Sequence, residues 1–421
     1  NDPAPNSLFI PSKILQWWVF VKRDVLSKLK NKQYMMINGL EAPALAFVLA
    51  MIVKNAVDSD SYNFYKNENI PAYIFMSIVV ALFMGLTISA EEIIKDRRIL
   101  KREKFLNLSK ASYLFSKIGI LFTISAVQAF LFVLIGNNLL EIEGLGFSYW
   151  LVLFTVSCFA NVLGLNISAS FNSAVTIYIL IPLILIPQMI LSGAMFNFDK
   201  INKVLGEENK VPFLAEVMVS RWAFEALSVE QFRNNKFEKK QFMYHKLESD
   251  LNYRTAYFIP EIKVMSNKCV KLLKDESEGA NDEFVSTLAL MQSAIQKENE
   301  RLSEDQKFDK VGLLTPKDFD RHLAKEVKEY LKGLNKFYSE YFVQVSELIE
   351  SKREGLFGEN DYHQMKTKYA NESLENLVRN TVSSKMIKDI NGSLEQVIDP
   401  IYRTPKKEGF GLTANFYSHM K

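Results

Sequence analysis

The sequence predicts an all-α protein, in which a polytopic membrane helix bundle of about five spans carries a large helical extracytoplasmic domain. The first observation behind this prediction is a run of 55 residues, 144–198, without a single Asp, Glu, Lys or Arg. A bilayer span needs roughly 20 apolar residues, and a surface helix of a water-soluble protein keeps a charged face. The second is a change of composition: apolar runs dominate as far as Phe198, whereas polar and charged residues dominate from Asp199 onward.

Net charge and cysteine content limit the possible partners. The chain of 421 residues is 48% hydrophobic and 24% charged, with a net charge of +3, so nothing in its charge favours a nucleic acid partner. Cys158 lies in an apolar run and Cys269 in the polar half, and we expect no disulfide between them. Because the first residue is Asn1 rather than Met, we expect a piece of a longer polypeptide.

Five segments are apolar enough to cross a membrane. We expect these spans at residues 36–57, 70–90, 113–135, 147–170 and 174–196. The first carries the weakest signal, because Glu41 and Pro43 lie near its start and Lys54 lies near its end.

Lysine and arginine in the short flanking segments predict the orientation of the spans. Basic side chains are frequent before the first span and at residues 95–104, between the second and third. The loop at 137–146 contains Glu141 and Glu143 and no basic residue. We therefore expect the N-terminus and residues 95–104 in the cytoplasm. Everything after Phe196 would then lie on the far side, as in a periplasmic domain of a bacterial inner-membrane protein.

The segment Ile14–Lys32, ahead of the first span, has amphipathic spacing. Trp17, Trp18 and other apolar side chains can lie against lipid headgroups, while the basic side chains face outward. A simple extension of the first span explains the same periodicity equally well.

The polar half is expected to be helical as well. Thr315-Pro316 predicts a helix start, with a capping hydroxyl followed by proline in the first turn. Further helices are expected over Phe284–Leu302 and Leu374–Ile387. After the Thr315 start, apolar residues recur at helical spacing: Leu323, Val327, Leu331, Leu334, Tyr338, Phe342, Val345 and Ile349. An intramolecular helical bundle is the usual explanation of such a stripe, and a partner-binding face is the alternative.

No catalytic, metal-binding or cofactor-binding pattern is recognisable in the sequence. The four histidines are scattered without an HExxH motif, and no GxxxxGK[ST] phosphate loop occurs. Leu191-Ser192-Gly193 resembles the start of an ATPase signature loop. It lies at the end of an apolar span, however, where small residues favour close helix packing or a chain break.

Ionisable groups are scarce in the third to fifth spans. Ion-coupled transport needs such groups at membrane depth, so the energy for a transporter of this kind would enter from outside the bundle. Apart from Lys117 at the edge of the third span, these spans offer amides that more often join helices than bind substrate: Gln128, Asn161, Asn166 and Gln188. The charged segment Glu91–Lys104 can receive energy by docking on another protein. A solvated loop that obeys the positive-inside rule explains its charge equally well.

Four motifs occur in order along residues 14–230. The amphipathic segment comes first, then Arg102-Glu103 with Tyr113–Lys117, then Ser192–Asn197, and finally Ser220–Leu227. In this order they resemble the membrane domain of a type-2 ABC exporter, closest to the White/ABCG-like group. They match its connecting helix, its coupling helix before the third span, its Ser-Gly turn after the fifth span and its membrane-edge helix.

The resemblance implies how the chain is divided and what it lacks. The expected parts are a cytoplasmic connecting helix over 1–35, a transmembrane bundle over 36–196, a membrane-edge helix and outer turn over 197–236, and a helical extracytoplasmic domain over 237–421. The family also has a sixth span and an ATPase domain, and neither is recognisable here. We therefore expect a fragment without its ATPase domain and last transmembrane helix.

Functional residues and partners are implied as well. Residues that would couple the bundle to the ATPase are Arg98, Arg102 and Glu103, and those that would line the substrate path are Phe83, Met84, Gln188 and Met189. ATP and Mg²⁺ would bind to the ATPase domain and not to this chain. Further expected partners are membrane lipid, a second permease subunit in a homodimer or pseudo-dimer, and an extracytoplasmic protein.

Two functions are therefore expected. The first is the permease component of an ATP-driven ABC exporter for a nonpolar or amphiphilic substrate. The alternative is a membrane anchor or mechanotransmission module that works the large extracytoplasmic domain on a protein partner.

Overall fold

The computed structural model describes residues 11–54, 62–102, 109–195, 211–274, 280–381, 386–389 and 392–403. The chain forms two compact units, which are treated separately here. Unit 1 extends to Asn235 and includes Thr367–Leu374, and unit 2 consists of Lys236–Lys366 and the chain from Glu375 onward. The prediction of an all-α protein is confirmed, since a small antiparallel hairpin is the only sheet in the described part of the chain.

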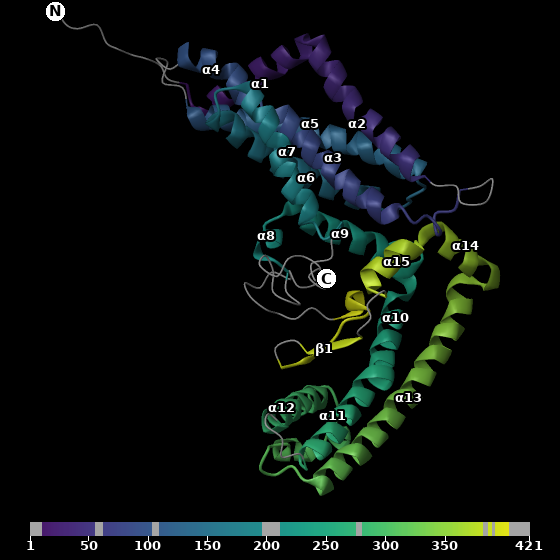
Figure 1. Ribbon diagram of the computed structural model, residues 1–421. Helices are drawn as coiled ribbons and strands as arrows, with labels where there is room; N and C mark the ends of the chain where they lie inside the picture. Colours follow the sequence, from purple (N-terminus) through teal and green to yellow (C-terminus); the bar gives the residue numbers. More distant parts are fainter. Residues whose placement is uncertain are drawn as a thin grey trace, which may run out of the picture. The chain divides into compact units, whose positions relative to one another are not determined.

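Unit 1 is a bundle of apolar helices (Figure 1). Its elements are α1 (Lys13–Lys30), α2 (Lys32–Val53), α3 (Ile70–Ser89), α4 (Glu92–Arg102), α5 (Lys110–Leu139), α6 (Gly146–Ser170), α7 (Ala174–Ile190), α8 (Phe213–Glu216) and α9 (Val219–Arg233). Four helical segments are long and apolar enough to cross a membrane: Lys32–Val53, Ile70–Arg102, Lys110–Leu139 and Gly146–Ser170. The fifth predicted span, α7, is an apolar helix of 17 residues that ends at Ile190, and Phe196 lies outside the described residues.

Close helix contacts hold α3 against α6. A Cβ atom added at Gly85 would lie 2.7 Å from the carbonyl oxygen of Ser157, and one added at Gly164 would lie 2.0 Å from Oγ of Ser89. The hydroxyl of Ser157 also donates a hydrogen bond to the carbonyl of Ala81 at 3.1 Å. Small residues allow membrane helices to approach in this way.

The helix α1 is separate from the first span. Asn31 has φ −85° and ψ 91°, which interrupts the helix, and its side chain accepts a hydrogen bond from the backbone N–H of Tyr34 at 3.1 Å. Ser12 caps the start of α1 in the same way, through the N–H of Leu15. Of the two interpretations of residues 14–32, the structure therefore supports an amphipathic helix rather than an extension of the first span.

Unit 2 is built from long helices around an apolar core. Its elements are α10 (Glu238–Tyr253), a π-helical turn η3 (Arg254–Phe258), α11 (Ile259–Leu272), α12 (Ala280–Asn299), α13 (Arg321–Phe357), α14 (Glu359–Tyr369), α15 (Glu372–Arg379), β1 (Ile387–Asp389) and β2 (Leu394–Gln396). The predicted stripe of α13 lies in this core, with Val327 and Leu331 fully buried. The stripe is thus an intramolecular face. Glu298 adds a polar contact, because it accepts hydrogen bonds from Arg254 Nε at 2.7 Å and from the hydroxyl of Tyr338.

Two helix boundaries in unit 2 differ from the predicted ones. The long helix begins at Arg321 instead of Thr315, because Asp320 caps it by accepting from the N–H of Leu323 at 2.7 Å. The hydroxyl of Thr315 instead donates to Asp318 in the preceding turn, at 2.6 Å. The helix predicted over 374–387 ends at Arg379, and its last predicted residue, Ile387, is the first of strand β1.

Candidate functional site

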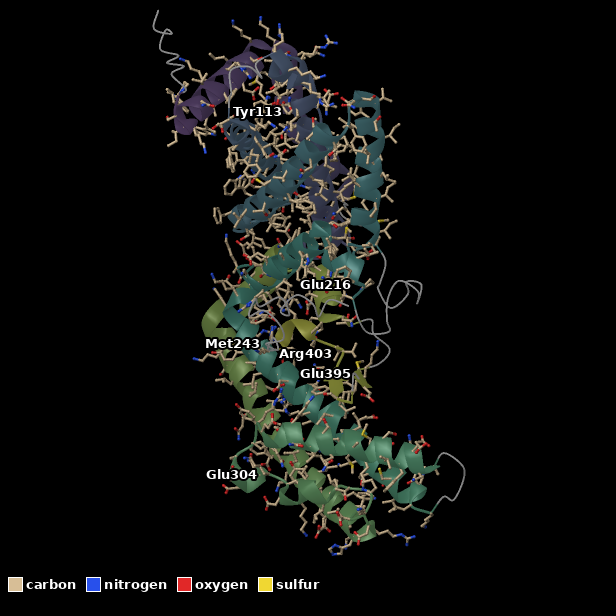
Figure 2. The ribbon with its side chains drawn as sticks, turned by 90° about the vertical axis from the view of Figure 1, so that its left-hand side faces the viewer. Tyr113, Glu216, Met243, Glu304, Glu395 and Arg403 are labelled. Atoms are coloured by element: carbon tan, nitrogen blue, oxygen red, sulfur yellow. The ribbon has the colours of Figure 1, made fainter. Side chains whose placement is uncertain are left out.

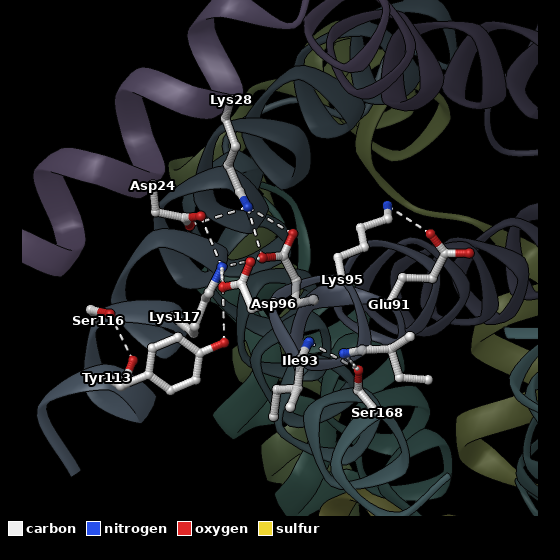
Figure 3. A network of polar contacts seen from close by, with 12 residues as sticks. Asp24, Lys28, Glu91, Ile93, Lys95, Asp96, Tyr113, Ser116, Lys117 and Ser168 are labelled. Atoms are coloured by element: carbon white, nitrogen blue, oxygen red, sulfur yellow. Dashed lines mark hydrogen bonds and ion pairs between the residues drawn. The ribbon is translucent and has the colours of Figure 1, made fainter. Parts of the chain in front are cut away.

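Charged side chains from three helices meet at one end of unit 1. This charge network consists of Asp24 and Lys28 on α1, Glu92 and Asp96 on α4, and Lys117 on α5 (Figure 3). Figure 2 shows Tyr113, one turn before Lys117, at this end of unit 1, and Glu216 at the opposite end. The three helices are far apart in the sequence, so the network forms only when they pack together.

Lys117 is the centre of the network. Its Nζ lies 2.8 Å from Asp24 Oδ1, 3.0 Å from Glu92 Oε2 and 2.9 Å from Asp96 Oδ2. Only 4% of the lysine side chain is exposed. Lys28 Nζ lies 2.7 Å from Glu92 Oε1 and 3.2 Å from Asp24 Oδ2, so both carboxylates connect the two lysines.

The burial of these charges makes the network costly to disrupt. A buried charge is tolerated when opposite charges and hydrogen bonds surround it, and removal of one partner leaves the others unpaired. Burial alone would raise the pKa of Asp24, but the adjacent Lys117 and Lys28 outweigh it and lower that pKa. The network therefore fastens α1 and α4 to the start of α5.

Additional hydrogen bonds fix α4 on two spans. The hydroxyl of Tyr113 on α5 donates to Asp96 Oδ2 at 3.0 Å. The backbone N–H groups of Ile93 and Ile94 donate to Oγ of Ser168 on α6, at 3.0 and 3.1 Å (Figure 3). Arg97 donates to carbonyl oxygens at the end of α6, including that of Ala169 at 2.9 Å. A displacement of α4 would thus reach both α5 and α6.

The sequence-predicted coupling residues lie outside this network. Arg98 and Arg102 are on α4 with exposed or half-exposed side chains, and neither forms an ion pair with any other described residue. Glu103 lies outside the described residues. The helix α4 therefore has a fixed face toward α1, α5 and α6 and a basic face that remains available. Its inner face shows that the segment is more than a solvated loop.

Sequence reasoning did not identify the charge network. Lys117 was recognised as an ionisable residue at the edge of a span, and such a residue normally needs a buried partner. That signal pointed to an ion pair but not to its partners, because Asp24 is 93 positions away in the sequence.

The four predicted substrate-path residues do not form one group in this chain. Met84 is buried, whereas 39% of Phe83 is exposed. Gln188 is buried and accepts hydrogen bonds from the backbone N–H and the hydroxyl of Ser220 on α9, at 3.2 and 2.9 Å. Met189 is half-buried. Gln188 therefore joins α7 to α9.

The direction of the helices separates these residues further. The start of α3 meets α9 through the rings of Phe75 and Phe224, whose centroids are 5.9 Å apart. The end of α7 also meets α9, so α3 and α7 run in opposite directions. Phe83 then lies six residues from the end of α3 near α4, whereas Gln188 lies two residues from the end of α7 near α9.

A second group of buried polar residues lies on α9. Arg221 exposes 1% of its side chain, and its Nη2 lies 3.6 Å from Oε2 of Glu225. Burial raises the pKa of Glu225 to about 8, although Arg221 opposes the shift. At the far end of α9, Gln231 accepts a hydrogen bond from the hydroxyl of Tyr149 on α6 at 3.1 Å. Among the described residues, no cluster of His, Cys, Asp and Glu could hold a metal ion.

Comparison with known proteins places this bundle in a family. Residues 15–232 match the family described as ABC-2 type transporter. The chain is similar to the ABC transporter G family member STR of Medicago truncatula, at 25% identity over 228 residues, which are 53% of this chain and 26% of that protein. It is also similar to the ABC transporter ATP-binding/permease protein Rv1747 of Mycobacterium tuberculosis, at 28% identity over 238 residues, 54% of this chain and 26% of that protein.

The chain thus spans about a quarter of the length of these relatives. The matched region contains the helices α1 to α7 and the charge network, and it ends within α9. Membrane domains of this family normally pair with an ABC ATPase. The chain therefore belongs to the ABC-2 type transporter family, as an integral membrane protein whose residues 15–232 are a permease domain of an ABC transporter.

Proposed function

We propose that unit 1 is the permease of an ATP-driven exporter and that α4 receives the movement of the ATPase. The observation that carries this proposal is the two-sided character of α4. One face is fixed to α1, α5 and α6 by buried ion pairs and hydrogen bonds. The other presents the exposed basic side chains of Arg98 and Arg102, which form no ion pair with another described residue. A helix that served only as a linker between two spans would not need buried charges on one face.

In the proposed mechanism, the N-terminus and α4 face the cytoplasm and unit 2 faces the periplasm of a bacterial cell. ATP with Mg²⁺ binds to an ATPase domain, which docks on the basic face of α4. The charge network then transmits the displacement to α5, and Ser168 transmits it to α6. Two permease subunits pair around a path for a nonpolar or amphiphilic substrate, to which Phe83 supplies apolar surface toward the α4 end and Met189 toward the α9 end.

Charge reversal on the exposed face of α4 tests this proposal. The double variant Arg98→Glu/Arg102→Glu in the complete transporter should lose most of its substrate-stimulated ATP hydrolysis, because the docking surface changes sign. The matched control is Lys22→Glu/Lys30→Glu, which reverses two exposed charges on α1. Equal loss in both variants, or no loss in the first, would contradict docking on α4. Residues 1–421 alone should hydrolyse no ATP.

A second function is favoured by the way in which the chain returns to unit 1. After the first part of unit 2, the segment Thr367–Leu374 packs again on unit 1. Asn371 donates hydrogen bonds to the carbonyls of Phe64 and Asn67, both at 2.8 Å. Lys368 lies 2.9 Å from Glu143. The chain therefore passes between the two units more than once, which favours a module that transmits movement to an outer protein partner.

Stimulation of ATP hydrolysis distinguishes the two functions. For an exporter, amphiphilic compounds should stimulate hydrolysis in the complete transporter, and Phe83→Ala, at an exposed position, should sharply reduce that stimulation. For a mechanotransmission module, only an outer protein partner should stimulate it, and Asn371→Ala should uncouple the partner. Stimulation by amphiphiles that survives Phe83→Ala would contradict the assigned path.

A further inference from the structure

A cavity of about 560 Å³ lies between α1, α2 and α5. Its walls are mainly apolar, and they include Trp17 and Val21 of α1, Met35 of α2, and Ile124 and Val127 of α5. Its volume is in the range of about 300–1,000 Å³ that ligand sites occupy. The space is open along one side, where Leu29, Met35 and Val127 are exposed, so an apolar occupant can enter it from the surrounding hydrocarbon.

Two glycines in the cavity wall are not used for helix packing. A Cβ atom added at Gly39 on α2 or at Gly119 on α5 would meet no atom within 4 Å. By contrast, a Cβ at Gly136 would lie 2.2 Å from the hydroxyl oxygen of Tyr73, and one at Gly85 would lie 2.7 Å from Ser157. Glycine weakens the interior of a helix, and close packing compensates at Gly85 and Gly136. At Gly39 and Gly119 the absence of a side chain instead widens the cavity.

The position of the cavity identifies the chemistry of its occupant. It lies between an amphipathic helix and two membrane spans, and the only solvent at that depth is hydrocarbon. Along α5 it extends from Gly119 to Leu131, twelve residues or about 18 Å at the helical rise. One leaflet of the hydrocarbon core, half of roughly 30 Å, is about 15 Å thick. The cavity is therefore about as long as one acyl chain.

One polar group in the wall lacks a partner. The hydroxyl oxygen of Tyr34 is buried and has no hydrogen-bond partner among the described residues. It lies near the α1 end of the cavity, because Nζ of Lys28 is 5.3 Å from the centre of its ring. Deeper in the wall, the side chain of Gln128 donates to the carbonyl of Asn38 at 3.0 Å and is satisfied. Because this oxygen has almost no accessible surface, the occupant can contact the ring of Tyr34 but not its hydroxyl, and an apolar occupant needs no hydrogen bond there.

We propose that this cavity binds one acyl chain of a membrane phospholipid. The site is separate from the predicted substrate path on α3 and α7. The lipid fills the space beneath α1 and supports the position of Lys28, whose side chain lines the cavity while its Nζ bonds Glu92. This site needs only the membrane location of the bundle and not the proposed export.

Photo-crosslinking tests the site directly. The protein is reconstituted in nanodiscs of phosphatidylcholine with a diazirine in one acyl chain, irradiated, and analysed by peptide mapping. Adducts should concentrate on the cavity faces of α1, α2 and α5. In Gly39→Phe/Gly119→Phe, these adducts should fall on the order of tenfold, since two large side chains occupy the space. The matched control is Gly146→Phe, another position with nothing within 4 Å but outside the cavity, and it should leave the adducts unchanged.

Two outcomes would overturn the proposal. One is an unchanged adduct yield in a Gly39→Phe/Gly119→Phe protein that melts like the wild type. The other is a density of adducts in the cavity no higher than on the exposed residues of α7, which would indicate annular lipid only. Gly39→Leu alone is a milder change that keeps the test available if the double variant does not fold, because a Cβ at this position meets no atom within 4 Å. It should lower the phosphatidylcholine retained in native mass spectrometry several-fold, and unchanged retention would also overturn the assignment.

Discussion

The two ends of unit 1 bury charge to a similar extent but satisfy it differently. At the α1–α4 end, Lys117 has three carboxylates within 3.0 Å. At the α9 end, Arg221 pairs with the half-exposed Glu216 at 2.8 Å but approaches the buried Glu225 only to 3.6 Å. The facing atoms of Arg221 and Glu225 have no hydrogen-bond partner among the described residues. Both basic side chains are almost fully buried, with 4% of Lys117 and 1% of Arg221 exposed.

This difference indicates two uses of buried charge. A complete network stabilises one arrangement of helices, because every change leaves an unpaired charge. In an incomplete pair, a group without a close partner can instead bind or release a proton and become neutral, which lowers the free-energy cost of burying it. The charge network accordingly suits a fixed connection from α4 to the bundle, whereas Glu225 suits a position whose charge changes with its surroundings.

The largest effect is expected from Lys117→Met. This change leaves three carboxylates around one remaining lysine, and loss of one partner from a buried ion pair costs about 3–5 kcal/mol. We expect the midpoint of thermal unfolding to fall sharply in detergent or nanodiscs. Lys110→Met is the control, because Lys110 is exposed on the same helix and surface substitutions usually stay within about 0.5 kcal/mol. Similar midpoints for the two variants would show that the network is not a fixed connection.

Hydropathy and charge patterns predicted much of unit 1, because each span is a local property of the sequence. The helices α3 and α6 begin within one residue of their predicted positions. The charge network depends on three segments that are distant in the sequence, and no local pattern encodes which acid meets Lys117. Only the packing of α1 and α4 on α5 brings Asp24 and Glu92 together.

Local sequence signals also predicted a wrong helix start where two candidate N-caps competed. Thr315-Pro316 has the composition of a helix start, but Asp320 lies closer to the apolar stripe and caps α13 instead. For Gln188 two kinds of sequence signal disagreed. Its residue type favours a contact between helices, and it does join α7 to α9, whereas the family resemblance places it on the substrate path. Neither signal identifies its partner Ser220, which is 32 positions further along the chain.

A smaller loss is expected from Arg221→Met. Glu225 then loses its only nearby cation, but a carboxyl group whose pKa is already near 8 can take up a proton instead of remaining charged. The cost should therefore be about 1–3 kcal/mol, as for an unsatisfied buried polar group. Thermal unfolding at pH 6 provides the measurement. A loss larger than that of Lys117→Met would reverse the comparison between the two ends.

A still smaller change in stability is expected when the pH rises through the pKa of Glu225. The folded state holds the pKa of Glu225 above its ordinary 4.5, at about 8, so folding is favoured while this group is protonated. That contribution is complete below about pH 4.5 and is lost as the pH rises through 8. Glu225→Gln should flatten this part of the stability profile. The control Glu230→Gln lies on the same helix, where Glu230 accepts from Ser148 at 2.8 Å, and should leave the slope in place.

The smallest change in stability is expected at acid pH from Asp24. Its sign is opposite to that of Glu225, because stability is lost as the pH falls. Lys117 and Lys28 hold the pKa of Asp24 below its ordinary 3.8 in spite of its burial, so this group stabilises the fold when it is ionised. Its contribution is present above about pH 4 and is lost as the pH falls through the lowered pKa. The acid limb of the stability profile should therefore be shallower in Asp24→Asn than in the wild type. Because many carboxylates titrate in this range, the difference between the two profiles is the quantity to measure. A steeper acid limb in the variant would show that the two lysines do not stabilise ionised Asp24. The charge network would then not be fully satisfied, and the contrast between the two ends of unit 1 would fail.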